Sequence, residues 1–359
     1  MSGIARVDVA TLTVGLDAWL EQWEPARRAG AQIHRLERPA SGWSSDTLLT
    51  TVHPPIDVLA NRQPVTELVF RVAPPAAVAS FPMDDFAPQA AVIGSLPSAG
   101  LPAPTVLAVE DDRQWLGAPF LVMTRSPGRA VGDAPALDPW LIGLPSTTQR
   151  RIHEGYLDAL AAIHRFDWHD AKLDGVLRQA GPDLKAEFAW WSAYIDWASE
   201  GTPAPELDGH LQWCIDTAPF MAHPPSLCWG DARLGNVLLR EDGSIGALLD
   251  WELASIGPPE ADLAWYLALD RLTTRVVGRS VPGFLARDDA ISRYQDHLGR
   301  PVEHLDWHEI FALVRSVAIN ERQARLAAAG GVPYPGIPGK DNPMLDYIRR
   351  RIQRFETLA

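Results

Sequence analysis

Alternation of apolar and polar positions divides the chain into a part rich in predicted strands and a longer part dominated by helices. Runs of apolar and β-branched residues predict strands over 41–52, 66–72, 102–108 and 117–124. Apolar residues at helical spacing predict helices over 9–23, 85–96, 147–166, 183–198, 206–218, 260–269, 288–298, 307–328 and 343–358. This order predicts an α+β protein, with a small antiparallel sheet first and a mostly helical part after it.

A short hairpin is predicted within the helical part. Asn236 opens the apolar run 237–239, and the sequence Glu-Asp-Gly-Ser at 241–244 is typical of a tight turn, because Asp-Gly tolerates positive φ. The second run, 245–249, leads directly into Asp250. In an antiparallel pair the start of one strand lies beside the end of the next. Asn236 and Asp250 are therefore predicted to meet, and their amide and carboxylate oxygens suit Mg²⁺.

Asp231 precedes Asn236 by five residues and is predicted to lie on the loop before the hairpin, facing a substrate. The spacing Asp, four residues, Asn, then a later Asp is that of a kinase catalytic loop followed by its metal-binding acid. We therefore expect Asp231 to be catalytic, orienting a hydroxyl and accepting its proton. Asn236 and Asp250 are expected to hold magnesium.

Composition narrows the classes of partner. The 359 residues carry a net charge of −13, which argues against nucleic acid or an anionic membrane surface as the main partner. No apolar run is long enough to span a bilayer and no signal peptide is recognisable, so we expect a cytoplasmic location. The only two cysteines, Cys214 and Cys228, are expected to be small buried residues in a reduced compartment. The oligomeric state is left open.

The motifs around the hairpin resemble those of a known family. They read W-G-D-A-R-L-G-N, then L-D-W-E, then A-D-L-A-W. They are similar to the aminoglycoside phosphotransferase-like family of small-molecule kinases, and most of all to the kinase-like domains fused to some acyl-CoA dehydrogenases. The resemblance implies a two-lobed protein-kinase-like fold, with a nucleotide-binding lobe over 1–124, a hinge at 125–128 and a catalytic and substrate-binding lobe over 129–359.

The same resemblance implies an activity. It is ATP-dependent transfer of the γ-phosphate to a hydroxyl of a small molecule, with Mg²⁺ as cofactor and GTP as an open alternative to ATP. The acceptor is not specified by the sequence, because a shared fold does not fix the substrate. Trp190, Trp191, Tyr194 and Trp197 form either an aromatic wall of the substrate pocket or ordinary packing. Acids such as Glu187 on the same helix are expected mainly on a solvated face.

Nucleotide contacts follow from the resemblance as well. Gly42 and Ser44 match the family's loop over ATP, although Ser45 stands where the family has Asn. Arg71, at the end of the second predicted strand, is expected to steady the nucleotide phosphates. Kinases usually pair this cation with an acid from the next helix, and the matching position here is Gln89, which leaves Asp84 and Asp85 as alternative partners.

The predicted hinge supplies the remaining nucleotide contacts. Backbone groups from Thr124 to Ser126 are expected to face the adenine edge, with Met123 nearby. Asp262 of the A-D-L-A-W motif is expected to hold the catalytic loop by hydrogen bonds. His164, at the end of a predicted helix, is expected to have a structural role, with its ring satisfied by backbone groups.

Two departures from the family pattern leave a second hypothesis open. Trp229 stands where the family's catalytic motif begins with His, and Gln89 replaces the usual acid. Trp fills the volume and donates one N–H but accepts no hydrogen bond. A kinase-like protein that binds nucleotide with little or no transfer is therefore the alternative. A protein kinase is disfavoured, since no A-P-E-like segment follows Asp250.

Overall fold

The computed structural model describes residues 8–39, 46–58, 63–331, 339 and 342–358. The chain forms two compact units. One comprises Met1–Ala90, Pro104–Arg125 and Arg322–Pro335, and the other comprises Ala91–Ala103, Ser126–Glu321 and Gly336–Ala359. The first unit is built around an antiparallel sheet and the second is mostly helical, as the order of predicted elements indicates.

The sheet of the first unit has five strands in the order β1-β2-β3-β5-β4, and every neighbouring pair is antiparallel. The strands are β1 (Gln32–Glu37), β2 (Asp46–Ile56), β3 (Val65–Val72), β4 (Val106–Glu110) and β5 (Phe120–Thr124). Four of them were predicted, with shifted ends. The sequence analysis missed β1, an edge strand whose side chains are all at least partly exposed and therefore give a weak apolar signal.

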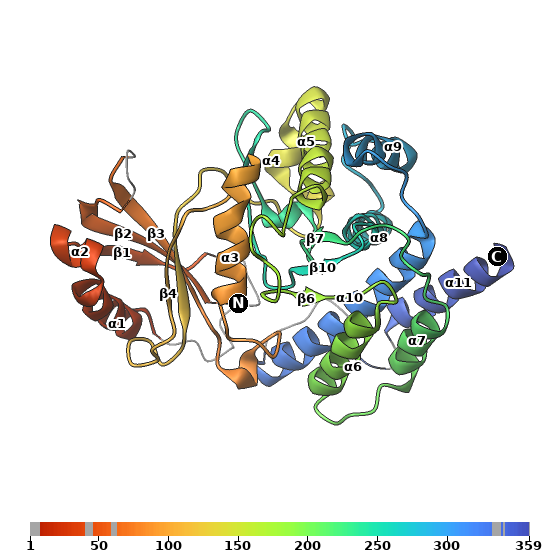
Figure 1. Cartoon of the computed structure of the whole chain (residues 1–359), viewed down its shortest axis with the longest axis horizontal. Coiled ribbons are helices and arrows are strands. Elements are labelled where there is room, and N and C mark those ends of the chain that lie inside the picture. Colours follow the sequence, from red (N-terminus) through yellow and green to blue (C-terminus); the bar gives the residue numbers. More distant parts are fainter. Residues whose placement is uncertain (1–7, 40–45, 59–62, 332–338, 340–341, 359) are drawn as a thin grey trace. The chain divides into compact units, whose positions relative to one another are not determined.

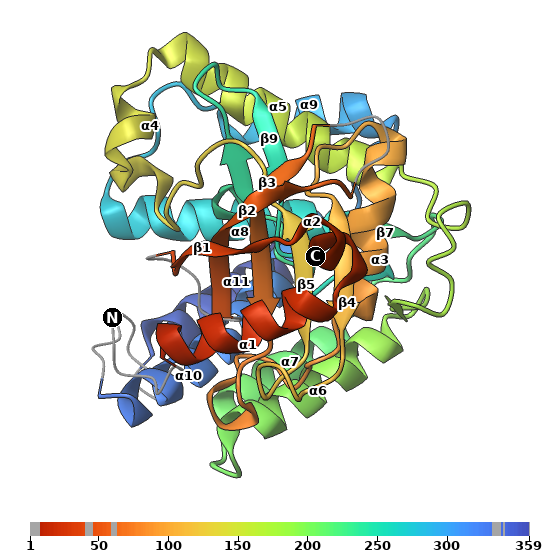
Figure 2. The same ribbon diagram turned by 90° about the vertical axis from the view of Figure 1, so that its left-hand side faces the viewer.

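A helix near the start of this unit packs on the sheet and contributes to its core. Figure 2 shows α1 (Val9–Gln22) lying across the strands. The side chain of Asp8 caps the helix, accepting hydrogen bonds from the N–H groups of Ala10 (2.9 Å) and Thr11 (3.1 Å). Trp19 packs edge-on against Phe70 and Phe120 of the central strands. The apolar spacing seen in the sequence is therefore the face that closes this core.

Most of the second unit is drawn in Figure 1 in yellow, green and blue. Its helices include α4 (Pro139–Gly143), α5 (Ser146–His164), α6 (Lys185–Ser199), α7 (Pro205–Asp216), α8 (Glu260–Val277), α9 (Arg287–Leu298) and α11 (Pro343–Leu358). Two further helices, α3 (Ala87–Ser95) and α10 (Leu305–Ala329), contribute residues to both units. The predicted helices are confirmed, and α8 continues eight residues beyond its predicted end.

Two small sheets lie in the second unit. One pairs β6 (Arg178–Gln179), β10 (Ser255–Gly257) and β7 (Ser226–Cys228), and none of these short strands was predicted. The other is the predicted hairpin of β8 (Val237–Leu239) and β9 (Ile245–Leu248). Each strand of the β6-β10-β7 sheet has only two or three residues, which is too short to give a periodic signal in the sequence.

Glu309 of α10 links several helices of this unit. Its side chain is 1% exposed and forms ion pairs with Arg271 of α8 (3.0 Å), Arg287 of α9 (2.6 Å) and Arg351 of α11 (3.0 Å). A buried carboxylate costs free energy unless its charge is compensated, and here three partly exposed guanidinium groups compensate it. The arrangement therefore couples the packing of the four helices.

Glu309→Gln should destabilise the protein by about 2–3 kcal/mol. This is below the ~3–5 kcal/mol expected for a fully buried pair, because the arginines remain partly hydrated. Urea unfolding measures the loss, with Glu241→Gln in the exposed hairpin turn as the control. Equal midpoints for the two variants would contradict the assigned role.

Candidate functional site

The hairpin brings two of the predicted site residues to the same end. Val237 pairs with Leu248, and the N–H of Leu249 donates to the carbonyl of Asn236 at 2.9 Å. Asn236 therefore lies opposite the residue that precedes Asp250. The predicted neighbourhood of Asn236 and Asp250 is thus present in the backbone pairing.

The Asp231 carboxylate is held by three side chains. Its Oδ1 accepts from the indole N–H of Trp265 (2.9 Å), and its Oδ2 accepts from the Asn236 amide and from Nε of Arg233, both at 2.8 Å. The Asn236 amide nitrogen also donates to the Asp231 carbonyl at 2.9 Å. These bonds fix the orientation of the carboxylate. They also occupy the amide hydrogens of Asn236, so its oxygen is the atom that suits a hard cation.

Arg233 is a residue whose role the sequence analysis did not assign, although it stands in the quoted motif. Besides Asp231, its guanidinium pairs with Asp133 on the loop before α4. Burial alone would lower the pKa of Arg233, but the two carboxylates outweigh it and raise the pKa above its usual value. A permanent positive charge therefore lies against the Asp231 carboxylate.

Asp250 adopts a backbone conformation that is unusual for a residue other than glycine. Its φ is +63°, in the left-handed region, which costs roughly 1 kcal/mol or more for such residues. The preceding residue is fixed on both sides, since the Leu249 N–H donates to Asn236 and its carbonyl accepts from the indole N–H of Trp229 at 2.8 Å. The Trp229 ring also stacks on Trp251, with ring centroids 5.3 Å apart. Trp229 therefore both fills space and donates its single N–H.

Asp262 holds the loop from the other side, as predicted. Its carboxylate accepts from the backbone N–H groups of Trp229 (2.5 Å) and Gly230 (2.9 Å). Nε2 of His164 lies 3.0 Å from the same carboxylate, and Nδ1 of His164 lies 2.5 Å from the Tyr294 hydroxyl. The His164 ring is thus satisfied by side chains, and not by backbone groups as the sequence analysis expected.

Cys228 lies next to this network but gives no sign of reactivity. The thiol is buried and donates to the carbonyl of Pro258 at 3.4 Å. Burial, with Asp262 nearby, raises the pKa of Cys228 well above its usual value, so the nucleophilic thiolate is disfavoured. The interpretation as a small buried residue is confirmed.

The predicted phosphate contact lies in the first unit. Arg71 is 8% exposed and pairs in register with Leu121. Among its candidate partners, Asp84 forms an ion pair with Arg113 (2.5 Å), and Asp85 accepts from the N–H of Ala87 (2.8 Å). The pairing of Arg71 with Gln89, Asp84 or Asp85 therefore stays a prediction.

The other predicted nucleotide contacts are only partly described. Gly42 and Ser44 lie outside the described residues. Met123 is buried in β5. Thr124 donates its N–H to the carbonyl of Thr105 (2.9 Å), and its hydroxyl accepts from the N–H of Thr105 (3.0 Å). Ser126, the first residue of the following stretch, belongs to the second unit.

Comparison with known proteins identifies the class. The family model of the phosphotransferase enzyme family (APH) matches residues 35–300, and the chain belongs to this family. Acyl-CoA dehydrogenase family member 10 of Mus musculus is 31% identical over 175 residues, which are 48% of this chain and 16% of that protein. The match therefore covers only a small part of that relative.

Solved structures show the same fold. A protein from Ralstonia eutropha JMP134, solved as a candidate aminoglycoside phosphotransferase, has a TM-score of 0.66 and 18% identity over 97% of this chain and 99% of that one. The GDP and kanamycin complex of APH(2")-IIIa has a TM-score of 0.53 and 16% sequence identity, over 90% of this chain and 94% of that one. A variant of APH(4)-Ia with AMP-PNP and hygromycin B has a TM-score of 0.50 and 17% identity, over 94% of this chain and 98% of that one.

These findings confirm the family resemblance and the α+β kinase-like fold. The protein is a kinase-like member of the phosphotransferase enzyme family. Among the residues that the structure describes, no helix has the length and apolar character needed to cross a membrane.

Gly230 provides a sharp test of the loop geometry. Its φ is +87°, and a Cβ at this position would lie 2.3 Å from the carbonyl oxygen of Leu253. Gly230→Ala should therefore cost about 3 kcal/mol or more, from backbone strain and overlap together. Gly175→Ala is the matched control, because Gly175 also has positive φ (+73°) but nothing within 4 Å of the added atom.

Gly175→Ala should lower the free energy of unfolding by only about 1–2 kcal/mol, which is the cost of placing a residue with a Cβ at positive φ. Urea unfolding of both variants gives the comparison. If Gly230→Ala loses no more stability than Gly175→Ala, the close approach of the loop to Leu253 is wrong.

Proposed function

We propose that the protein transfers the γ-phosphate of ATP to a hydroxyl of a small molecule. The observation that carries the proposal is the fixed Asp231 carboxylate, whose oxygens accept from Trp265, Asn236 and Arg233. A carboxylate held in one orientation on the loop before the hairpin is suited to orient a hydroxyl and take its proton. Membership of the phosphotransferase enzyme family and the nucleotide complexes of similar folds support it.

In this proposal Asn236 and Asp250 hold magnesium. The donor set fits, since the Asn236 amide hydrogens are already engaged and the hairpin aligns Asn236 with the backbone before Asp250. Held there by Asn236 and Asp250, the ion would supply positive charge that offsets the negative charge developing on the transferred phosphate. Arg233 places a positive charge against Asp231, and the carboxylate's proposed role is largely to position the hydroxyl.

The nucleotide is proposed to contact Arg71 through its phosphates, together with Gly42 and Ser44. Its base is proposed to meet Met123, Thr124 and Ser126. The division into a nucleotide-binding lobe over 1–124, a hinge at 125–128 and a catalytic lobe over 129–359 belongs to the same proposal. GTP is the alternative donor.

The second hypothesis, nucleotide binding with little or no transfer, started from Trp229 and Gln89. The Trp229 indole donates to Leu249, and Asp231 retains its partners. This replacement is therefore compatible with an ordered catalytic loop, and we favour the active form of the proposal.

Removing the proposed metal ligand should abolish metal-dependent nucleotide binding. In Asp250→Ala the carboxylate beside the cation is lost, an interaction worth several kcal/mol in a partly dry site. Calorimetric titration with ATP, with and without Mg²⁺, should show that the wild-type gain from Mg²⁺ disappears. An unchanged Mg²⁺ effect in the variant would refute the ligand assignment.

Asp231→Asn should separate catalysis from folding. The amide keeps one acceptor oxygen but loses charge and basicity, so transfer should fall roughly 10²–10⁴-fold while Mg-ATP affinity stays close to wild type. Turnover, nucleotide affinity and melting temperature are measured on one preparation. A lower melting temperature with normal turnover at low temperature would identify Asp231 as structural.

A further inference from the structure

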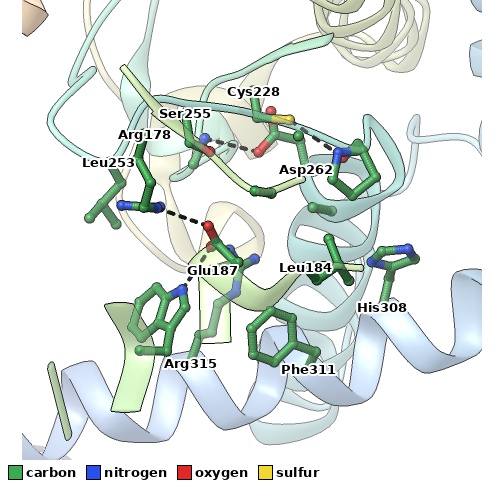
Figure 3. A pocket seen from close by; sticks show the side chains of 16 residues that line it. Arg178, Leu184, Glu187, Cys228, Leu253, Ser255, Asp262, His308, Phe311 and Arg315 are labelled. Atoms are coloured by element: carbon green, nitrogen blue, oxygen red, sulfur yellow. Dashed lines mark hydrogen bonds and ion pairs between the residues drawn. The ribbon is translucent and has the colours of Figure 1, made fainter. Parts of the chain in front are cut away.

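A small pocket borders the loop that carries Asp231. It is lined by residues of β6, α6 and α10, by Gly230 of that loop and by Leu253 of the segment before β10, and Figure 3 shows its labelled side chains. Gly230 directly precedes Asp231 in the chain. The volume of the pocket, about 20 Å³, is enough for a group the size of a water molecule. The pocket belongs entirely to the second unit.

Two arginines share one acid at this pocket. Nε of Arg178 donates to Oε2 of Glu187 at 2.9 Å, and NH1 of Arg315 lies 3.9 Å from Oε1 of the same carboxylate. The remaining hydrogen bond to Glu187 comes from the indole of Trp191. Arg178 therefore compensates Glu187, and Arg315 lies at a longer distance from the same carboxylate. With Asp262, which also lines the pocket, the charged side chains here are two arginines and two acids. Glu187 is buried, whereas the sequence analysis expected it on a solvated helix face.

Arg315 is buried with less compensation than such a charge normally has. It is 5% exposed and stacks against the rings of Trp265 (4.7 Å) and Phe311 (5.3 Å). Its Nε has no hydrogen-bond partner among the described residues. Burial lowers the pKa of Arg315, which shows that its charge is costly in this position. A buried donor that lacks a partner is unfavourable, and a ligand oxygen would satisfy it.

His308 adds a second unsatisfied group on the same face of α10. It is 2% exposed, and within the described part of the chain neither ring nitrogen has a hydrogen-bond partner. Burial lowers the pKa of His308 to about 3, so the ring is neutral near pH 7 and still offers one N–H. Both Arg315 and His308 therefore present donors to the pocket.

The pocket is also connected to the proposed catalytic carboxylate. Trp265, which stacks on Arg315, donates its indole N–H to Asp231 at 2.9 Å. A group bound at Arg315 would therefore contact a side chain that itself packs on Trp265, the residue that orients Asp231. Asp262 lines the pocket too, but its carboxylate is engaged by the N–H groups of Trp229 and Gly230.

We propose that this pocket binds one oxygen of an anionic group, such as a carboxylate, of the acceptor, with Arg315 as the principal contact and His308 as a second donor. The inference rests on the proposed function and specifies its substrate class. It distinguishes this chain from a kinase for polycations such as kanamycin, which would need unpaired acids, whereas both acids at this pocket, Glu187 and Asp262, are already engaged.

The test uses three acceptors that share the same two hydroxyl groups: glycerate, glycerol and 3-aminopropane-1,2-diol. ADP formation with Mg-ATP is measured for each. Glycerate should have the lowest KM, by about tenfold or more over glycerol, and the cationic compound should have the highest, because charge-assisted hydrogen bonds are worth that factor. A preference for the cation, or no saturation by glycerate in protein that binds Mg-ATP, overturns the inference.

Two substitutions should change the KM for glycerate in opposite directions. Arg315→Met should raise the KM for glycerate about tenfold or more, because the cation is lost. Glu187→Gln should lower the KM for glycerate, because it removes a negative charge beside Arg315. The matched control is Arg350→Met on the exposed face of α11, which should leave the KM for glycerate unchanged.

A purely structural role for the cluster predicts that both pocket variants weaken binding, and that result would overturn the inference. Melting temperatures show whether each variant folds, and Arg315→Lys serves in place of Arg315→Met if the latter unfolds, with a smaller rise in KM expected. Failure of the wild-type protein to bind Mg-ATP would instead refute the proposed function itself.

Discussion

The proposed catalytic loop depends on the carboxylate of Asp262. This side chain is 1% exposed and binds two consecutive backbone N–H groups, those of Trp229 and Gly230. Hydrogen bonds from a backbone N–H to a buried carboxylate are strong because one partner is charged. Asp262 lies in the first turn of α8, where the helix dipole favours a negative charge. The position of the loop is thus set by the start of a long helix.

The geometry of the loop explains how it tolerates a residue that differs from the family pattern. Trp229 is fixed by Asp262 through its backbone and reaches Leu249 through its indole N–H. Leu249 in turn bonds to Asn236 and precedes Asp250, which adopts the left-handed conformation. The proposed metal ligands and the proposed catalytic carboxylate of Asp231 are therefore connected through backbone groups as well as side chains. A ring that supplies one donor is sufficient for this connection.

Much of the architecture was predictable because it depends on local patterns. The long helices have apolar residues at helical spacing, and the hairpin has two apolar runs around Asp-Gly, so both appeared in the sequence. The short strands of the β6-β10-β7 sheet were not predictable, since their pairing depends on contacts distant in the chain. The same reason hid the partners of Glu187, because Arg178 and Arg315 come from β6 and α10. Side-chain networks of this kind depend on tertiary packing, which a spacing pattern does not contain.

The most direct test of the account follows the phosphoryl group itself. The protein is incubated with [γ-³²P]ATP, Mg²⁺ and a deproteinised cell extract that contains small molecules only, and labelled products are separated. The account predicts that ³²P moves into a small organic molecule, only when both Mg²⁺ and the protein are present. Label that stays in ATP, or appears only as inorganic phosphate or on the protein, would contradict it.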